Sequence, residues 1–148
     1  MKLLRYRQKT DWTCGPACLK VVLHFFGVNK DISELIKELK TTEKTGTDHQ
    51  RMINLLKKYK LKFIVKKNAT LEEIKKSLID SLVVVDYFIP YYQESHYSIV
   101  KKIKGERIYF HDTHFGPNHR YKIDYFLRNW WDEEAKRWLV AIKKPNET

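Results

Sequence analysis

The chain has 148 residues, of which 43% are hydrophobic and 14% aromatic, and its 29 basic and 18 acidic residues give a formal charge of +11. This length predicts one domain over residues 1–148 with room for a substantial core, and the composition excludes a disordered or low-complexity chain. No apolar run approaches the roughly 18 residues of a membrane span, and charged residues follow the first methionine at once, unlike a signal peptide. We therefore expect a cytoplasmic protein.

The positive charge predicts attraction to acidic partners without identifying one. The basic residues are mostly lysine pairs dispersed along the chain, such as Lys57-Lys58 and Lys101-Lys102, as on an ordinary solvated surface. No helix-turn-helix, zinc or RNA-recognition motif accompanies them. We expect no obligatory nucleic-acid partner, and nucleic-acid binding through the basic surface stays an alternative.

The first predicted element is a helix that begins at Cys14 and runs to about Phe26. Pro16 suits the first turn, where a missing N–H costs nothing, and apolar residues recur behind it at helical spacing. Gly27 is the stop signal. Because the free N–H groups at a helix start stabilise negative charge, this position favours a thiolate at Cys14.

Two more helices are expected in the first third of the chain. Residues 31–39 carry apolar side chains on one side, with Asp31 or Ser33 as the cap. After a loop, Thr47 with Gln50 three residues on resembles a capping box that begins a third helix.

The pattern then changes from helix to strand. Residues 61–66 read as a strand, and Thr70 with Glu73 forms a second capping-box pattern that begins a fourth short helix. Residues 81–88 are nearly all β-branched or aromatic, as expected of a central strand that is buried on both faces.

The last third completes an antiparallel sheet. Residues 96–103 and 107–112 flank a turn at Gly105 and predict a hairpin. A short helix near 123–130 and a final strand over 138–142 follow. The predicted fold class is α+β, with helices first and an antiparallel sheet after them.

The two cysteines, Cys14 and Cys18, lie four residues apart on one face of the first helix. A disulfide between them would close a very short loop and constrain little, so we expect free thiols. Zinc would need two more ligands, and the histidines show no second closely spaced ligand pair, so we expect no metal and no other cofactor. Cys18 fits a small buried core residue beneath Cys14.

A thiol nucleophile needs a base to take its proton and a third group to orient that base. His96 opens the first strand of the hairpin and Asp112 closes the second, so both lie at one edge of the sheet. His96 is nine residues before Gly105 and Asp112 is seven after it, near enough in register to touch. We expect Asp112 to hold the imidazole of His96 toward Cys14.

Gln8 lies six residues upstream of Cys14 and completes the predicted site. Its side-chain amide and the backbone N–H of Cys14 are candidate donors to an oxyanion. Structural readings stand beside these roles: Cys14 as a small buried residue, His96 as a strand-end histidine, and Asp112 as a cap for the loop before Gly116.

The remaining candidates surround this site. His111 alternates to the face opposite Asp112, and His114 and His119 fall on the loop that follows, so none of these three is assigned to catalysis. Four residues are assigned to substrate binding, namely Asp11, Trp12, Tyr97 and Trp130. Asp11 and Trp12 shape the entrance or serve only in packing. Apolar walls for the acyl side of the substrate are expected from Tyr91, Tyr92, Trp130 and Trp131.

Residues 8–19, 96–100 and 112–117 resemble the papain-like cysteine peptidases. The resemblance is to the branch that contains the double-glycine leader peptidases fused to bacteriocin-exporting transporters, and their stand-alone relatives. The order and spacing of the three segments cover most of the chain. The resemblance implies a papain-like fold, with an N-terminal helical half packed on a C-terminal antiparallel sheet.

The same resemblance implies a function for each residue of the motifs. Cys14 is the nucleophile, His96 the base, Asp112 its orienter and Gln8 the oxyanion donor, and the substrate is a peptide or protein. An acyl or peptidyl transferase would use the same residues. A non-catalytic module that binds a peptide or partner in the cleft is the second alternative, although an intact triad argues against it.

Overall fold

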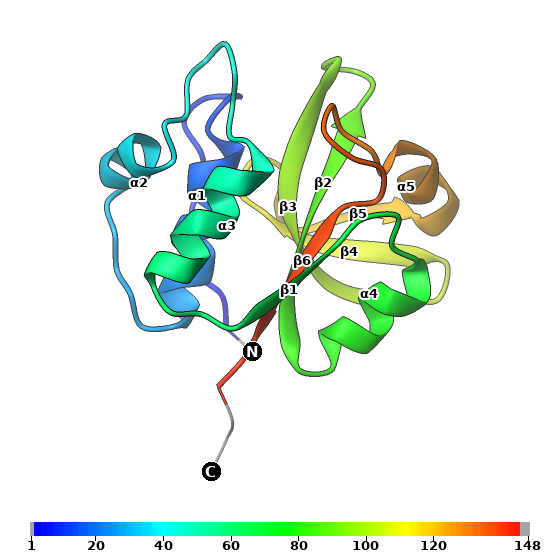
Figure 1. Ribbon diagram of the computed structural model, residues 1–148. Coiled ribbons are helices and arrows are strands. Elements are labelled where there is room, and N and C mark those ends of the chain that lie inside the picture. Colours follow the sequence, from blue (N-terminus) through cyan, green and yellow to red (C-terminus); the bar gives the residue numbers. More distant parts are fainter. Residues whose placement is uncertain (1, 146–148) are drawn as a thin grey trace.

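The computed structural model describes residues 2–145. Its elements in chain order are α1 (Cys14–Phe25), α2 (Ile32–Glu38), α3 (His49–Lys58), β1 (Phe63–Lys66), α4 (Leu71–Leu78), β2 (Ser81–Ile89), β3 (Glu94–Lys104), β4 (Arg107–Asp112), β5 (Gly116–Lys122), α5 (Ile123–Asn129) and β6 (Leu139–Lys143). The strands form one six-stranded antiparallel sheet in the order β1-β6-β2-β3-β4-β5. Helices α1, α2 and α3 lie on one side of this sheet, and α4 and α5 lie on the other (Figure 1).

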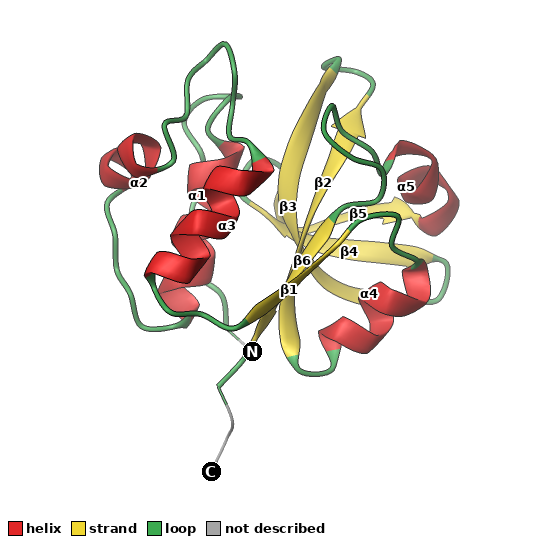
Figure 2. Ribbon diagram, viewed as in Figure 1, coloured by secondary structure: helices red, strands yellow, loops and turns green. Residues whose placement is uncertain are grey.

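Each face of the sheet carries its own apolar core. One core joins α1, α2 and α3 to side chains of β2, β3 and β6, and the other joins α4 and α5 to the opposite face. Figure 2 shows the sheet between these two groups of helices. Strand β2 lies between β6 and β3, and every residue from Ser81 to Ile89 except Phe88 is buried. The predicted central strand, buried on both faces, is therefore confirmed.

Helix α1 follows the prediction closely. It begins at Cys14, ends at Phe25, and is followed by Gly27 in the left-handed region with a φ of 84°. Gly15 lies directly against the side chain of Thr47, which occupies the space that a Cβ at position 15 would need. Because glycine has no Cβ, the start of α1 and the segment that leads into α3 can touch, and Cys14 lies at this contact.

The predicted capping box at the start of α3 is wrong. The N-cap is Asp48, whose carboxylate accepts a hydrogen bond from the backbone N–H of Arg51 at 2.8 Å. The Thr47 hydroxyl is 2.6 Å from the Thr41 hydroxyl, so it is engaged in the preceding loop. The cap therefore moves to the next residue, and Gln50 has no reciprocal role. The capping box at Thr70, by contrast, is present as predicted.

Strand β5 was not predicted, because residues 113–122 were expected to form a loop. It lies at the edge of the sheet, pairs only with β4, and alternates between half-buried and exposed residues. Gly116 and Pro117 at its start read as a turn signal, yet proline is tolerated at the beginning of an edge strand. An edge strand with polar residues gives little hydrophobic periodicity to detect.

The close contact at Gly15 gives a stability prediction. In most helices Gly→Ala stabilises by up to about 1 kcal/mol, but Gly15→Ala is expected to destabilise by about 1–3 kcal/mol because the new methyl group meets Thr47. Urea unfolding followed by circular dichroism measures the change. His24→Ala, on an exposed position of the same helix, is the control and should change stability by much less. A stabilised Gly15→Ala protein would contradict the close contact.

Candidate active site

His96 and Asp112 meet across the β3–β4 hairpin. His96 Nε2 lies 2.8 Å from Asp112 Oδ2, and both side chains are buried. Ile99 pairs with His111, so Asp112 stands across from Ser98 and beside His96 on the same face. The Ser98 hydroxyl donates to the same carboxylate oxygen at 2.5 Å. The structure thus brings together the two residues that the hairpin argument placed at one edge.

The carboxylate of Asp112 is held by hydrogen bonds on both oxygens. Its Oδ1 accepts from the backbone N–H groups of His114 and Phe115, at 2.7 and 2.8 Å. Burial alone would raise the pKa of Asp112, but the charge of His96 and the hydrogen bonds from His96 and Ser98 hold this pKa well below its usual range. Asp112 is therefore a carboxylate at neutral pH.

The imidazole of His96 responds to this carboxylate. Burial lowers the pKa of His96, yet the charge and hydrogen bond of Asp112, together with the neighbouring Cys14 thiol, raise it well above the ordinary value. Because Asp112 occupies Nε2, Nδ1 is the ring nitrogen that remains for Cys14. The arrangement stabilises an imidazolium, which is the state that forms when a thiol passes its proton to histidine.

The two cysteines of α1 have different surroundings. Cys14 is the first residue of the helix, where backbone N–H groups have no partner within the helix. Cys18 lies one turn further along and is 1% exposed. Burial raises the pKa of Cys18 well above the ordinary value, and nearby Cys14 and Asp112 raise it further. Both thiols are free, as predicted, and Cys18 is a protonated core residue.

Gln8 is buried and fixed at both ends of its amide. The Thr113 hydroxyl donates to Gln8 Oε1 at 2.7 Å, and Gln8 Nε2 donates to the carbonyl of Thr10 at 2.8 Å. The backbone N–H of Gln8 also donates to the Thr113 carbonyl at 2.9 Å. Since an amide nitrogen has two N–H groups, one remains for another acceptor. Sequence reasoning missed Thr113, whose only signal was its position next to Asp112.

A small cavity of about 60 Å³ adjoins this site. Its lining combines residues of the N-terminal loop, the end of β2, the start of β3, the turn between these two strands and the β4–β5 turn, namely Gln8, Asp11, Ile89, Tyr92, Glu94, Ser95, His96 and His114. Tyr92 is 45% exposed and packs edge-on against His114, with the ring centroids 5.8 Å apart. The cavity is small, and His96 is one of the residues that line it.

The predicted substrate-binding residues divide into two pairs. Asp11 is exposed and lines the cavity, and Trp12 is half-buried beside it in the same loop. Tyr97 is buried, and its hydroxyl donates to the Thr47 carbonyl at 2.8 Å. Trp130 is 1% exposed and packs in the apolar core between α5 and the sheet. Tyr97 and Trp130 therefore contribute to packing, and we do not include them in the cleft.

The other aromatic candidates lie on the surface. Tyr91 is 89% exposed in the β2–β3 turn, next to Tyr92. Trp131 is 39% exposed and stacks on Phe88, with the ring centroids 4.2 Å apart. His111 points away from Asp112, and its Nε2 lies 2.8 Å from the Leu4 carbonyl. The turn at Tyr91 and Tyr92 is the part of the expected apolar wall that adjoins the cavity.

Comparison with known families identifies the class of protein. The model of the Peptidase C39 family matches residues 4–135, and the chain belongs to this family. The predicted resemblance to the double-glycine peptidases is thereby confirmed. Comparison with curated proteins finds no match. Among the described residues, 2–145, no helix has the length and apolar character needed to cross a membrane.

Solved structures share the fold over almost the whole chain. A putative C39-like peptidase from Bacillus anthracis has 16% identity and a TM-score of 0.79, with 97% of this chain and 96% of that chain covered. The peptidase domain of Streptococcus ComA, a bi-functional ABC transporter involved in a quorum-sensing pathway, has 20% identity, a TM-score of 0.75 and coverage of 97% and 98%. A double glycine motif protease from an AMS/PCAT transporter, in complex with the leader peptide, has 16% identity, a TM-score of 0.74 and coverage of 97% and 93%. The expected papain-like α+β fold is confirmed.

The contacts of His96 predict how its pKa responds to loss of the carboxylate. Asp112→Asn removes the charge that raises the pKa of His96, while the burial that lowers it stays, so this pKa should fall by at least about one pH unit. NMR titration of the His96 ring measures it, with exposed His24 as the internal reference. Ser98→Ala keeps the carboxylate and should cause a smaller fall. An unchanged midpoint in Asp112→Asn would show that Asp112 does not control the protonation of His96.

Proposed function

We propose that this protein is a cysteine peptidase in which Cys14 is the nucleophile and His96 the base. Asp112 orients His96, and Gln8 donates a hydrogen bond to the oxyanion. The observation that carries the proposal is the buried His96–Asp112 pair. The second ring nitrogen of His96, Nδ1, remains for the thiol of Cys14 at the start of α1. Membership of a peptidase family supports the same reading.

The reaction follows from these positions. His96 Nδ1 takes the proton of Cys14, and the sulfur attacks the carbonyl carbon of the peptide bond. The resulting oxyanion accepts hydrogen bonds from the side chain of Gln8 and from the backbone N–H of Cys14. His96 then gives its proton to the leaving amine, which departs and leaves a thioester on Cys14. Water, deprotonated by His96, attacks this thioester and releases the acid and the free thiol.

The cavity favours small residues on the substrate. Its volume of about 60 Å³ leaves little room for a bulky substrate side chain between Tyr92, His114 and His96. A structural neighbour is a double glycine motif protease in complex with a leader peptide. We therefore propose a peptide substrate with two small residues before the scissile bond, entering past Asp11 and the turn at Tyr91.

The two cysteines offer a matched test of the nucleophile. Iodoacetamide near neutral pH should label Cys14 in preference to Cys18, because Cys18 is 1% exposed against 8% for Cys14 and burial raises the pKa of Cys18. Cys14→Ala should lower cleavage of a Gly-Gly-containing peptide by at least about 1000-fold, and Cys18→Ala should leave most of it. Mass spectrometry maps the label and follows the cleavage.

Three outcomes would contradict this proposal in different ways. Cleavage that survives in Cys14→Ala would remove Cys14 as the nucleophile. Labelling of Cys14 without any peptide cleavage would favour a non-catalytic binding module. Transfer of the acyl group to an added amine faster than to water would favour a transferase that uses the same residues.

The hydrogen bond between Thr113 and Gln8 predicts a positioning role for Thr113. Gln8→Ala should lower kcat by about 100-fold or more through loss of an oxyanion donor. Thr113→Val removes the hydroxyl that fixes Gln8 Oε1 and should lower kcat by about tenfold with little change in KM. Thr113→Ser keeps the hydroxyl and should restore kcat. Equal losses in Thr113→Val and Thr113→Ser would assign Thr113 to packing alone.

A further inference from the structure

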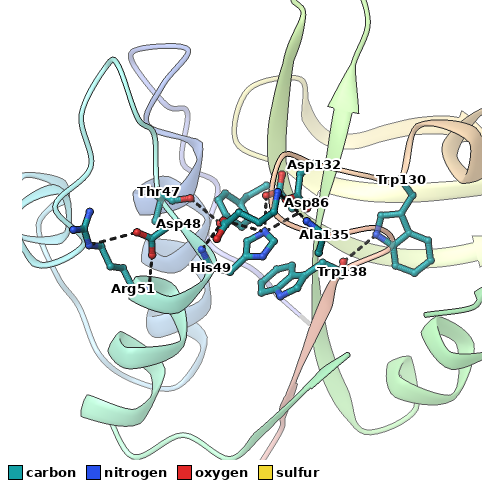
Figure 3. Close-up of polar contacts among 11 residues, drawn as sticks. Thr47, Asp48, His49, Arg51, Asp86, Trp130, Asp132, Ala135 and Trp138 are labelled. Atoms are coloured by element: carbon teal, nitrogen blue, oxygen red, sulfur yellow. Dashed lines mark hydrogen bonds and ion pairs between the residues drawn. The ribbon is translucent and has the colours of Figure 1, made fainter. Parts of the chain in front are cut away.

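A second group of polar side chains lies apart from the thiol, at the junction of three elements. His49 is the first residue of α3, Asp86 comes from β2, and Asp132 and Glu134 come from the loop between α5 and β6. Figure 3 shows the carboxylates of Asp86 and Asp132 turned toward the ring of His49. We call these four residues the His49 cluster. None of them takes part in the proposed peptidase mechanism.

The side chains of the His49 cluster converge on one ring nitrogen. His49 Nε2 lies 3.0 Å from Asp86 Oδ2, 3.3 Å from Asp132 Oδ2 and 3.6 Å from Glu134 Oε2. His49, Asp86 and Asp132 are buried and offer one ligand atom each within 4.8 Å of one another. One nitrogen thus faces three carboxylate oxygens in the interior of the protein.

Two carboxylate oxygens of the cluster lack a hydrogen bond. Among the described residues, Asp86 Oδ1 has no hydrogen-bond partner, and Asp132 Oδ2 lies 3.3 Å from His49 Nε2 without forming a hydrogen bond, although both oxygens are buried. The side chains of Asp86 and Asp132 are only 5% and 2% exposed. A single imidazolium does not neutralise the two buried carboxylates of Asp86 and Asp132, and unpaired buried anions are costly.

We propose that the His49 cluster binds a divalent transition-metal ion of the zinc type. His49 Nε2 and one oxygen each of Asp86, Asp132 and Glu134 would be the ligands. One imidazole with three carboxylates is a mixed nitrogen and oxygen set, which suits zinc, cobalt or manganese better than calcium or magnesium, whose protein ligands are oxygens alone.

The distances from His49 Nε2 to the three carboxylate oxygens agree with such an ion. Zinc bonds to nitrogen and oxygen of about 2.0–2.2 Å place neighbouring ligands of a tetrahedral ion about 3.4 Å apart. The three distances from His49 Nε2, 3.0, 3.3 and 3.6 Å, lie around this value. An ion between these atoms would replace the proton that Nε2 otherwise shares with the carboxylates.

The ligands are also held in place by their neighbours. The ring of His49 stacks on Trp138, with the centroids 4.1 Å apart. Asp132 Oδ1 accepts from the backbone N–H groups of Glu134 and Ala135, at 2.7 and 3.2 Å, so its other oxygen is left facing the cluster. Outer contacts of this kind orient metal ligands. The Glu134 side chain is 44% exposed, so the His49 cluster borders on solvent at this residue.

The test measures metal binding to the full chain and does not depend on peptidase activity. The Cys14→Ser protein is used so that the thiol cannot bind the probe, and Zn²⁺ is titrated by calorimetry. We expect one Zn²⁺ per chain, a rise in melting temperature, and a shift of the His49 ring signals in NMR while those of His96 stay. Co²⁺ in place of Zn²⁺ should give visible bands of nitrogen and oxygen coordination.

Matched variants separate the cluster from other histidines and carboxylates. Asp132→Asn should weaken Zn²⁺ binding at least about tenfold, as even the loss of an outer contact does. Glu134→Gln, at a half-exposed position that should fold normally, should also weaken it. His24 and Glu43 are exposed, and the His24→Gln and Glu43→Gln proteins are the controls, in which Zn²⁺ binding should not change. If no Zn²⁺ binds, or if Glu134→Gln and Asp132→Asn both bind as tightly as the parent, the cluster is only a buried ion pair.

Discussion

A one-residue bulge in β3 decides whether the peptidase site can exist. The register of the hairpin shifts between Val100 and Lys102, so Lys101 has no partner on β4. Side chains alternate across a sheet, and a shift of one residue moves a strand's side chains to the other face. Without the bulge, Asp112 would stand across from Ile99 and face away from His96. With it, Asp112 stands across from Ser98 and reaches the imidazole.

The end of β4 and the turn after it contact both the sheet and the N-terminal loop. Asp112 anchors His96 of the sheet, and the next residue, Thr113, anchors Gln8 of the N-terminal loop. The backbone of this turn adds the N–H groups that hold the Asp112 carboxylate. One short stretch of chain therefore sets the positions of the proposed base and of the proposed oxyanion donor relative to each other, while the thiol of Cys14 comes from α1.

Much of this arrangement could be predicted from the sequence because it has local signals. Short patterns of neighbouring residues predict the start of α1, the Thr70 capping box, the buried strand β2 and the turn at Gly105. The count of residues around Gly105 also placed His96 and Asp112 at one edge. That count could not reveal the bulge, since Lys101-Lys102 looks like any exposed lysine pair.

Other features depend on contacts between distant segments and have no local signal. Trp130 and Trp131 are neighbouring tryptophans, yet Trp130 packs in the core and Trp131 lies on the surface. The His49 cluster draws its members from α3, β2 and a loop, so a search for closely spaced ligand pairs could not find it. The edge strand β5 is polar and begins with Gly116-Pro117, so its pairing with β4 shows only in three dimensions.

The contact between Gly15 and Thr47 links the thiol to the rest of the helical layer. Thr47 also bonds to Thr41 through its hydroxyl and to Tyr97 through its carbonyl, so it is held from two directions. Gly15 at the start of α1 packs directly on the side chain of Thr47 and places no side chain of its own between them. The backbone position of Cys14 is therefore set by packing between whole segments, so a shift of α1 against the sheet would move the proposed nucleophile relative to His96.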